Sequence, residues 1–143
     1  MWTYQHTETT NASREDVWAI WSDVPRWPDW DPATRKVSID GPFAAGTHGK
    51  VTPNLGPTLK FTINDFRPLE NFNFDVTMPG GVIHFGHSLS DAPGGRVAAT
   101  HATQITGPLA ELYGRLAGPD LKRFGPLAVR GLVCAAERRA SAG

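Results

Sequence analysis

Residues 12–31 read ASREDVWAIWSDVPRWPDWD, and this stretch constrains the fold more than any other part of the chain. Ser13 stands three residues before Asp16, which is the spacing of a side-chain cap at the start of a helix. Pro25 and Pro28 then end the helix, because proline lacks a backbone donor. The apolar residues between cap and prolines recur on one face of a short amphipathic helix, and they are Val17, Trp18, Ile20 and Trp21.

The segment after this helix, residues 25–32, holds three prolines and two tryptophans. Proline restricts the backbone and tryptophan offers a large area for burial, so we expect a short helical turn followed by a fixed loop. The tryptophans resemble a stacking platform for bases or sugars, but only Arg26 adds a basic charge among them, which favours packing of the short helices. The four residues concerned are Trp18, Trp21, Trp27 and Trp30.

Strand patterns flank this region on both sides. Residues 2–10 are rich in threonine and aromatic side chains without a helical period, which predicts an opening strand whose two faces the pattern does not distinguish. From about residue 34 to 106, segments of alternating polarity are separated by turns that contain glycine and proline. This spacing predicts an antiparallel meander of six strands at residues 34–40, 46–52, 58–67, 70–78, 81–90 and 96–106.

The strand at 70–78 has one wholly apolar face, formed by Phe72, Phe74, Val76 and Met78. Such a sheet face needs a covering layer, and the stretch from Pro108 to about Ala140 is the one candidate. It predicts a long helix, since apolar residues recur there at three to four positions. Gly118-Pro119 and Gly125-Pro126 interrupt the pattern, so we expect kinks and two helical pieces.

The composition of the 143 residues indicates one globular domain, residues 1–143. Lys and Arg number 14 and so do Asp and Glu, which argues against nucleic acid as a partner. The single cysteine, Cys134, excludes an internal disulfide and fits a cytoplasmic location. Neither an apolar run of membrane-spanning length nor a secretion signal is present, so we expect no stable membrane insertion.

This order of elements resembles the helix-grip fold of START-related, polyketide cyclase/dehydrase-like proteins of the SRPBCC superfamily. The resemblance rests on residues 12–18, which are similar to the family's helix entry, and above all on residues 21–31, which are similar to the signature that follows it. It implies an α+β domain in which a curved sheet of about seven strands encloses a long, kinked C-terminal helix. It also implies a hydrophobic cavity between sheet and helix, and so a binder or converter of a small apolar molecule. Members of the family differ widely in chemistry, so the site must identify the reaction.

Two histidines fall on the more apolar faces of neighbouring predicted strands, His87 on 81–90 and His101 on 96–106. If Ser90 lies opposite Arg96 across the hairpin loop, the two histidines are diagonal neighbours roughly 7–8 Å apart. They can then act as acid or base, or bind a ligand oxygen. The alternative is that each fills the core with its nitrogens hydrogen-bonded.

Further residues are candidates for the same cavity. Asp65 shares a strand face with Phe61 and can pair with a histidine, or it can be a solvated strand end. Tyr113 lies on the apolar stripe of the C-terminal helix, where its hydroxyl either binds a ligand or stays at the edge of the core. The predicted apolar lining consists of Phe61, Phe72, Phe74, Phe85, Leu112, Leu116 and Phe124.

Metal and cofactor sites have no support in the sequence. His84 and His87 are three residues apart, which on a strand turns them to opposite faces and prevents joint chelation. Glycine-rich phosphate loops and hydrolase motifs are absent, and Cys134 lies among small apolar residues without an acid or histidine beside it. We therefore expect neither metal nor cofactor.

The sequence favours noncovalent binding of a small hydrophobic or amphipathic molecule, of lipid, polyketide or aromatic type, with His87 and His101 as polar handles. One alternative is an enzyme similar to the aromatic polyketide cyclases, in which these histidines, with Asp65 or Tyr113, move protons. Another is an interaction scaffold for a protein partner, although no exposed apolar stripe in the sequence requires one. The expected oligomeric state is a monomer or a homodimer.

Overall fold

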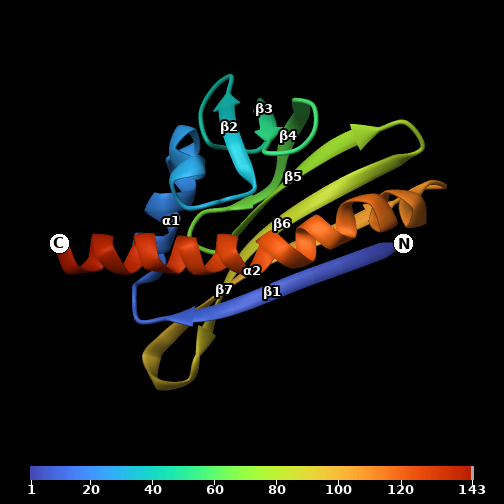
Figure 1. The fold of residues 1–143 in the computed structure, drawn as a ribbon. Coiled ribbons are helices and arrows are strands. Elements are labelled where there is room, and N and C mark those ends of the chain that lie inside the picture. The colour runs from blue at the N-terminus through green and yellow to red at the C-terminus, as the bar shows by residue number, and fades with distance from the viewer. Residues whose placement is uncertain (143) are drawn as a thin grey trace.

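The computed structural model describes residues 1–142, and their elements follow the predicted order with strand boundaries within two residues of expectation. The antiparallel sheet of seven strands with short helices and a long C-terminal helix is confirmed (Figure 1). The elements are β1 (Trp2–Thr10), α1 (Arg14–Ser22), the 3₁₀ helix η1 (Val24–Asp29), β2 (Thr34–Ile39), β3 (His48–Pro53), β4 (Leu59–Arg67), β5 (Asn71–Met78), β6 (Gly81–Ala92), the 3₁₀ turn η2 (Pro93–Gly95), β7 (Arg96–Thr106) and α2 (Ala110–Ala142).

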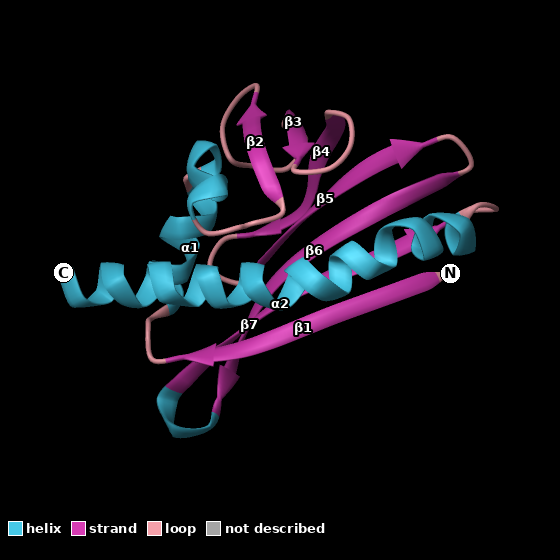
Figure 2. Ribbon diagram, in the orientation of Figure 1, coloured by secondary structure: helices cyan, strands magenta, loops and turns pink. Residues whose placement is uncertain are grey.

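The sheet has the order β1-β7-β6-β5-β4-β3-β2, so the first strand pairs with the last and the other strands form the meander. Helix α2 crosses in front of the sheet and runs close to β1, as Figure 2 shows, and it packs against β1, β7 and α1. The core lies between this helix and the sheet, and its fully buried side chains come from both layers and from α1, among them Trp21, Ile63, Phe72, Ile105 and Leu132.

The cap predicted for α1 is present. The hydroxyl of Ser13 accepts a hydrogen bond from the backbone of Asp16 at 3.1 Å, and the Asp16 carboxylate accepts one from the backbone of Ser13 at 3.2 Å. This reciprocal pair satisfies two amides that a helix start leaves open. Val17 and Trp21 on the inner face of the helix are fully buried, so the start of α1 is fixed where its apolar face meets the core.

Helix α2 is continuous over 33 residues, and the prediction of two separate pieces was wrong. Its two prolines, Pro119 and Pro126, each remove one backbone donor, which bends a helix without ending it, and the bend is visible in Figure 1. The nearby glycines have a packing role as well. A methyl group at Gly114 would lie 2.4 Å from the Trp2 ring, and one at Gly125 would lie 3.0 Å from Tyr4. The glycines therefore let α2 approach the aromatic side chains of β1.

Within residues 1–142 no helix combines the length and the apolar character needed to cross a membrane.

Candidate functional site

A cavity of about 320 Å³ lies between the sheet and α2. Its inner wall consists of side chains from β1, β5, β6 and β7, and its opposite wall comes from α2. Trp27 and Trp30 of the α1–β2 segment close a third side. Its exposed lining residues are Asn54 and Leu55 in the β3–β4 loop and Asp120 on α2, so the cavity opens between that loop and the helix. This volume is at the lower end of the ~300–1,000 Å³ typical of small-molecule pockets.

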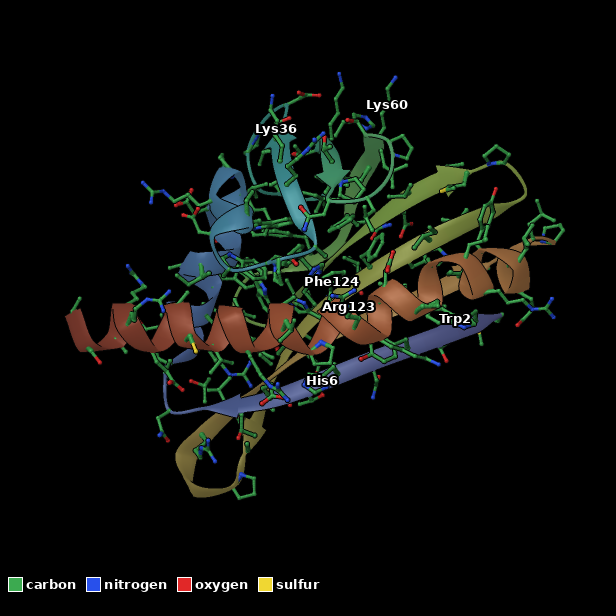
Figure 3. The ribbon with its side chains drawn as sticks, in the orientation of Figure 1. Trp2, His6, Lys36, Lys60, Arg123 and Phe124 are labelled. Atoms are coloured by element: carbon green, nitrogen blue, oxygen red, sulfur yellow. The ribbon has the colours of Figure 1, made fainter. Side chains whose placement is uncertain are left out.

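Five of the predicted site residues line this cavity: Phe74, Phe85, His87, His101 and Phe124. Figure 3 shows Phe124 on α2 and His6 on β1, a further lining residue that sequence reasoning did not select. Phe61 and Phe72 lie deeper in the core and do not line the cavity. They support its wall instead, because the Phe61 ring packs on Phe74 at 4.6 Å and the Phe72 ring stacks on His87 at 4.1 Å.

The predicted contribution of Leu112 and Leu116 to the lining is not found. These side chains are 47% and 68% exposed, on the outer side of α2. The inner side of this part of the helix carries Gly114 and Gly118 instead, because Trp2 of β1 fills the space there. Tyr113 is likewise outside the cavity, and its hydroxyl donates a hydrogen bond to the carbonyl of Pro79.

Asp65 also lies away from the cavity. Its side chain is 55% exposed and approaches Arg67, with 3.8 Å between carboxylate and guanidinium. The register of β4 against β5 shifts between Asn64 and Arg67, and Asp65 has the left-handed φ of 42°. This bulge interrupts the alternation on which the inward placement of Asp65 was predicted.

His87 and His101 are direct cross-strand neighbours, not diagonal ones, and their ring centroids are 4.7 Å apart. The difference arises in the hairpin loop, where Ala92 lies opposite Arg96 in place of the expected Ser90. Gly94 and Gly95 both adopt left-handed φ values, 76° and 73°, which allows a three-residue turn and extends β6 by two residues.

The register continues this row onto β1, where His6 lies opposite His101. Three histidines therefore occupy one rung across β1, β7 and β6, and all three line the cavity. Nε2 of His6 contacts the carboxylate of Glu8, which also lies 3.7 Å from the guanidinium of Arg130 on α2. Trp2, Tyr4, His6 and Glu8 alternate along residues 2–10 and share the inner face of β1. The sequence contains this pattern, but it identifies the inner face only once β1 is known to pack under α2.

Hydrogen bonds fix the tautomers of two histidines in this rung. Nδ1 of His87 lies 3.2 Å from the carbonyl oxygen of Phe72, which only accepts, so the proton is on Nδ1. Nε1 of Trp21 donates to Nε2 of His101 at 3.3 Å, so in the neutral ring the proton of His101 is also on Nδ1. Nε2 of His87 and Nδ1 of His101 have no hydrogen-bond partner among residues 1–142.

Both rings are neutral near pH 7. Burial lowers the pKa of His87 well below its ordinary value of 6.5, helped by the neighbouring His101 and opposed by the hydrogen bond to Phe72. Burial, with a smaller effect of His6, lowers the pKa of His101 to about 4. His87 and His101 therefore present uncharged imidazoles to an apolar cavity.

Asp31 is a further titratable group at the cavity wall. Burial raises the pKa of Asp31, while hydrogen bonds from the backbone of Ala33 and the hydroxyl of Thr34, both at 2.9 Å, oppose that effect. Asp31 follows the two tryptophans that close the cavity, Trp27 and Trp30. Sequence reasoning assigned these tryptophans to packing alone, but they pack and line the cavity at once.

His84 lies on the outer face of the sheet, opposite to His87, as the strand alternation predicts. Its Nδ1 is 2.8 Å from Asp75 and its Nε2 is 3.0 Å from the hydroxyl of Thr106. Within the described part of the chain, no cluster of three or more histidine, cysteine, aspartate or glutamate residues is placed to hold a metal ion.

The fold and the cavity define a class of helix-grip proteins, and the comparisons name the family. Residues 1–138 match the model of the family described as polyketide cyclase / dehydrase and lipid transport, and the chain belongs to this family. No curated protein matches the sequence.

Solved structures share the fold at low sequence identity. The Zhui aromatase/cyclase from Streptomyces sp. R1128 is 17% identical over 97% of this chain and 95% of its own, with a TM-score of 0.77. A START superfamily protein from Mycobacterium smegmatis is 13% identical, with 95% and 97% covered and a TM-score of 0.69. Norcoclaurine synthase from Thalictrum flavum is 18% identical, with 97% and 86% covered and a TM-score of 0.70. At these identities the likeness concerns the fold.

Proposed function

We propose that the protein binds a small hydrophobic or amphipathic molecule noncovalently in the cavity between the sheet and α2. The observation that carries the proposal is the cavity itself, about 320 Å³ with aromatic walls and uncharged histidines in its lining. Apolar walls with a few placed polar groups are the usual composition of a small-molecule site. The family description, which includes lipid transport, and the aromatase/cyclase that shares the fold are consistent with such a ligand.

Native mass spectrometry of the protein purified from its own host tests this proposal. We expect a retained apolar molecule of lipid, polyketide or aromatic type, which denaturing extraction then identifies. The blocking variant is Ala128→Leu, because Ala128 is buried in the cavity wall on α2. Its matched control is Ala140→Leu, at an exposed position of the same helix. Equal retention by both variants would place the molecule elsewhere and contradict the proposal.

A second candidate function is acid–base catalysis of the polyketide cyclase/dehydrase type, favoured by the unpartnered nitrogens of His87 and His101 beside the cavity. The unprotonated Nε2 of His87 can act as a base, and the protonated Nδ1 of His101 can act as an acid or donate a hydrogen bond. Asp65 and Tyr113, the other residues predicted for this role, lie outside the cavity and are not part of the proposal.

The two functions separate in the double variant His87→Gln with His101→Gln. Loss of turnover of a bound polyketone with binding retained would support catalysis, and unchanged turnover would exclude it. A cytoplasmic location, a monomeric or homodimeric state and the lack of a nucleic-acid partner stay predictions from the sequence.

A further inference from the structure

The histidine rung also bears on which ligand the cavity takes. We propose that the cavity selects an uncharged ligand that carries a hydroxyl group, and that this hydroxyl donates a hydrogen bond to Nε2 of His87 and accepts one from Nδ1 of His101. The inference rests on the proposed binding function and deepens it by naming the ligand chemistry.

The first support is the pair of tautomers. The bond to the Phe72 carbonyl leaves His87 with an acceptor nitrogen, and the bond from Trp21 leaves His101 with a donor nitrogen. The ring centroids are 4.7 Å apart, and the proposal requires one ligand oxygen to lie within hydrogen-bond reach of both free nitrogens. A hydroxyl both donates and accepts through one atom, whereas an ether or ketone oxygen only accepts.

The second support is that the free nitrogens remain accessible. Among residues 1–142, the one side-chain polar atom that is sealed from solvent and lacks a partner is Nε1 of Trp30. The unpartnered nitrogens of His87 and His101 are therefore not sealed, and both residues line the cavity.

The third support is the charge of the lining. No lysine or arginine lines the cavity within the described part of the chain, whereas Asp31 and Asp120 do. His87 and His101 resist protonation, so neither offers a counter-charge to an anion. Desolvating a carboxylate there is unfavourable without a partner, which favours the uncharged hydroxyl over an acid of the same shape.

Isothermal titration calorimetry at pH 7.5 with three two-ring probes tests the inference. The probes are 2-naphthol, 2-methoxynaphthalene, which accepts but does not donate, and 2-naphthoate, which is anionic. We expect 2-naphthol to bind at least about tenfold more tightly than either of the other two, because without the ligand proton Nε2 of His87 is left unpartnered. Equal affinities overturn the inference and leave the proposed function standing. Failure of all three to bind contradicts the proposed function itself.

The variant His87→Leu removes the acceptor, and we expect it to bind 2-naphthol and 2-methoxynaphthalene equally. Its matched control is His84→Gln, on the same strand but on the outer face, which should keep the preference. Nitrogen-15 NMR of the imidazoles in the unmutated protein supplies a test that does not depend on the folding of a variant. A protonated Nδ1 and an unprotonated Nε2 in His87 are expected, and the opposite tautomer overturns the inference.

Discussion

The imidazoles of His87 and His101 illustrate how a single hydrogen bond defines the chemistry of a residue. Each ring uses one nitrogen to contact a group that has only one possible role, a carbonyl oxygen for His87 and an indole N–H for His101. The second nitrogen then has the complementary role. In this protein the two rings consequently offer an acceptor and a donor side by side, although both are histidines with the same proton position.

The depressed pKa of His101 predicts that stability falls in acid. Its pKa is about 4 in the folded protein and 6.5 ordinarily, so between these values the unfolded chain binds a proton that the folded one does not. Stability is therefore fully present above about pH 6.5 and is lost as pH falls toward 4, by about 3 kcal/mol at ~1.4 kcal/mol per pKa unit. His87 shifts in the same direction. The groups facing His101 are His87 on β6, His6 on β1 and the indoles of Trp21 and Trp30.

Urea denaturation at pH 7.5, 6, 5 and 4 measures this effect. The His101→Gln variant keeps an amide that can accept the hydrogen bond from Trp21. The difference in free energy of unfolding between the unmutated protein and this variant should narrow as the pH falls from 7.5 to 4. All other titratable groups are the same in both proteins, so the narrowing reports on His101. The outer-face variant His84→Gln serves as the reference. Parallel curves for His101→Gln and the unmutated protein would show that the His101 ring is not neutralised by burial.

Among the elements, α2 depends on glycine for its position. A methyl group at Gly131 would lie 2.0 Å from the carbonyl oxygen of Trp30, which is backbone and cannot move aside easily. One at Gly118 would lie 3.1 Å from the edge of the Trp2 ring. Because these two positions are glycines, the helix can pack closely against both β1 and the segment that closes the cavity.

Gly131→Ala should destabilise the protein by roughly 1–3 kcal/mol through overpacking. The sign of this change in stability is informative, because without overpacking the substitution of glycine by alanine would stabilise a helix by about 1 kcal/mol. Gly118→Ala is the matched comparison within the same helix, and its loss should be smaller because it meets only a side chain. Thermal or urea unfolding measures both, and a more stable Gly131→Ala would contradict the close packing of α2 on Trp30.

The outward face of α2 gives a second prediction at this scale. Leu116 is 68% exposed whereas Leu132 is fully buried, although both belong to the apolar pattern of the sequence. Leu116→Ser should change the free energy of unfolding by less than about 0.5 kcal/mol, and Leu132→Ala should reduce it by roughly 2–5 kcal/mol. Urea unfolding of the two variants measures this contrast. Similar losses of unfolding free energy in both would mean that the outer face of α2 around Leu116 is covered in solution.

These elements also show what the sequence could and could not predict. The Ser13–Asp16 cap and the alternation along Phe72–Met78 depend on neighbours in the chain, and both were predicted correctly. The inner face of the first turns of α2 depends on Trp2, a residue more than a hundred positions away, and there the apolar stripe indicated the wrong side, at Leu112 and Leu116. Farther along the helix the stripe was correct, since Phe124 lines the cavity and Leu132 is fully buried. The bulge at Asp65 is likewise a matter of pairing between strands.

For the molecule as a whole, a ligand that binds only the folded cavity raises the unfolding temperature by mass action. At a free concentration one hundred times its Kd, stabilisation is about 2.7 kcal/mol, which is roughly 5–10 °C for a chain of this length. Differential scanning calorimetry with 2-naphthol should show this shift for the unmutated protein and for Ala140→Leu. Ala128→Leu, which fills the cavity, should show none, and an equal shift in all three would indicate binding outside the cavity.

The position of β1 at the sheet edge determines when the site can exist. Thr10 pairs with Val97, 87 positions later in the chain, and Trp2 pairs with Ile105. During synthesis at roughly 5–20 residues per second, the strand that carries His6 therefore waits several seconds on the ribosome for its partner. The cavity wall that holds the histidine rung is thus among the last parts of the nascent chain to form. A ligand that needs this wall therefore cannot bind while the strands before β7 are being synthesised.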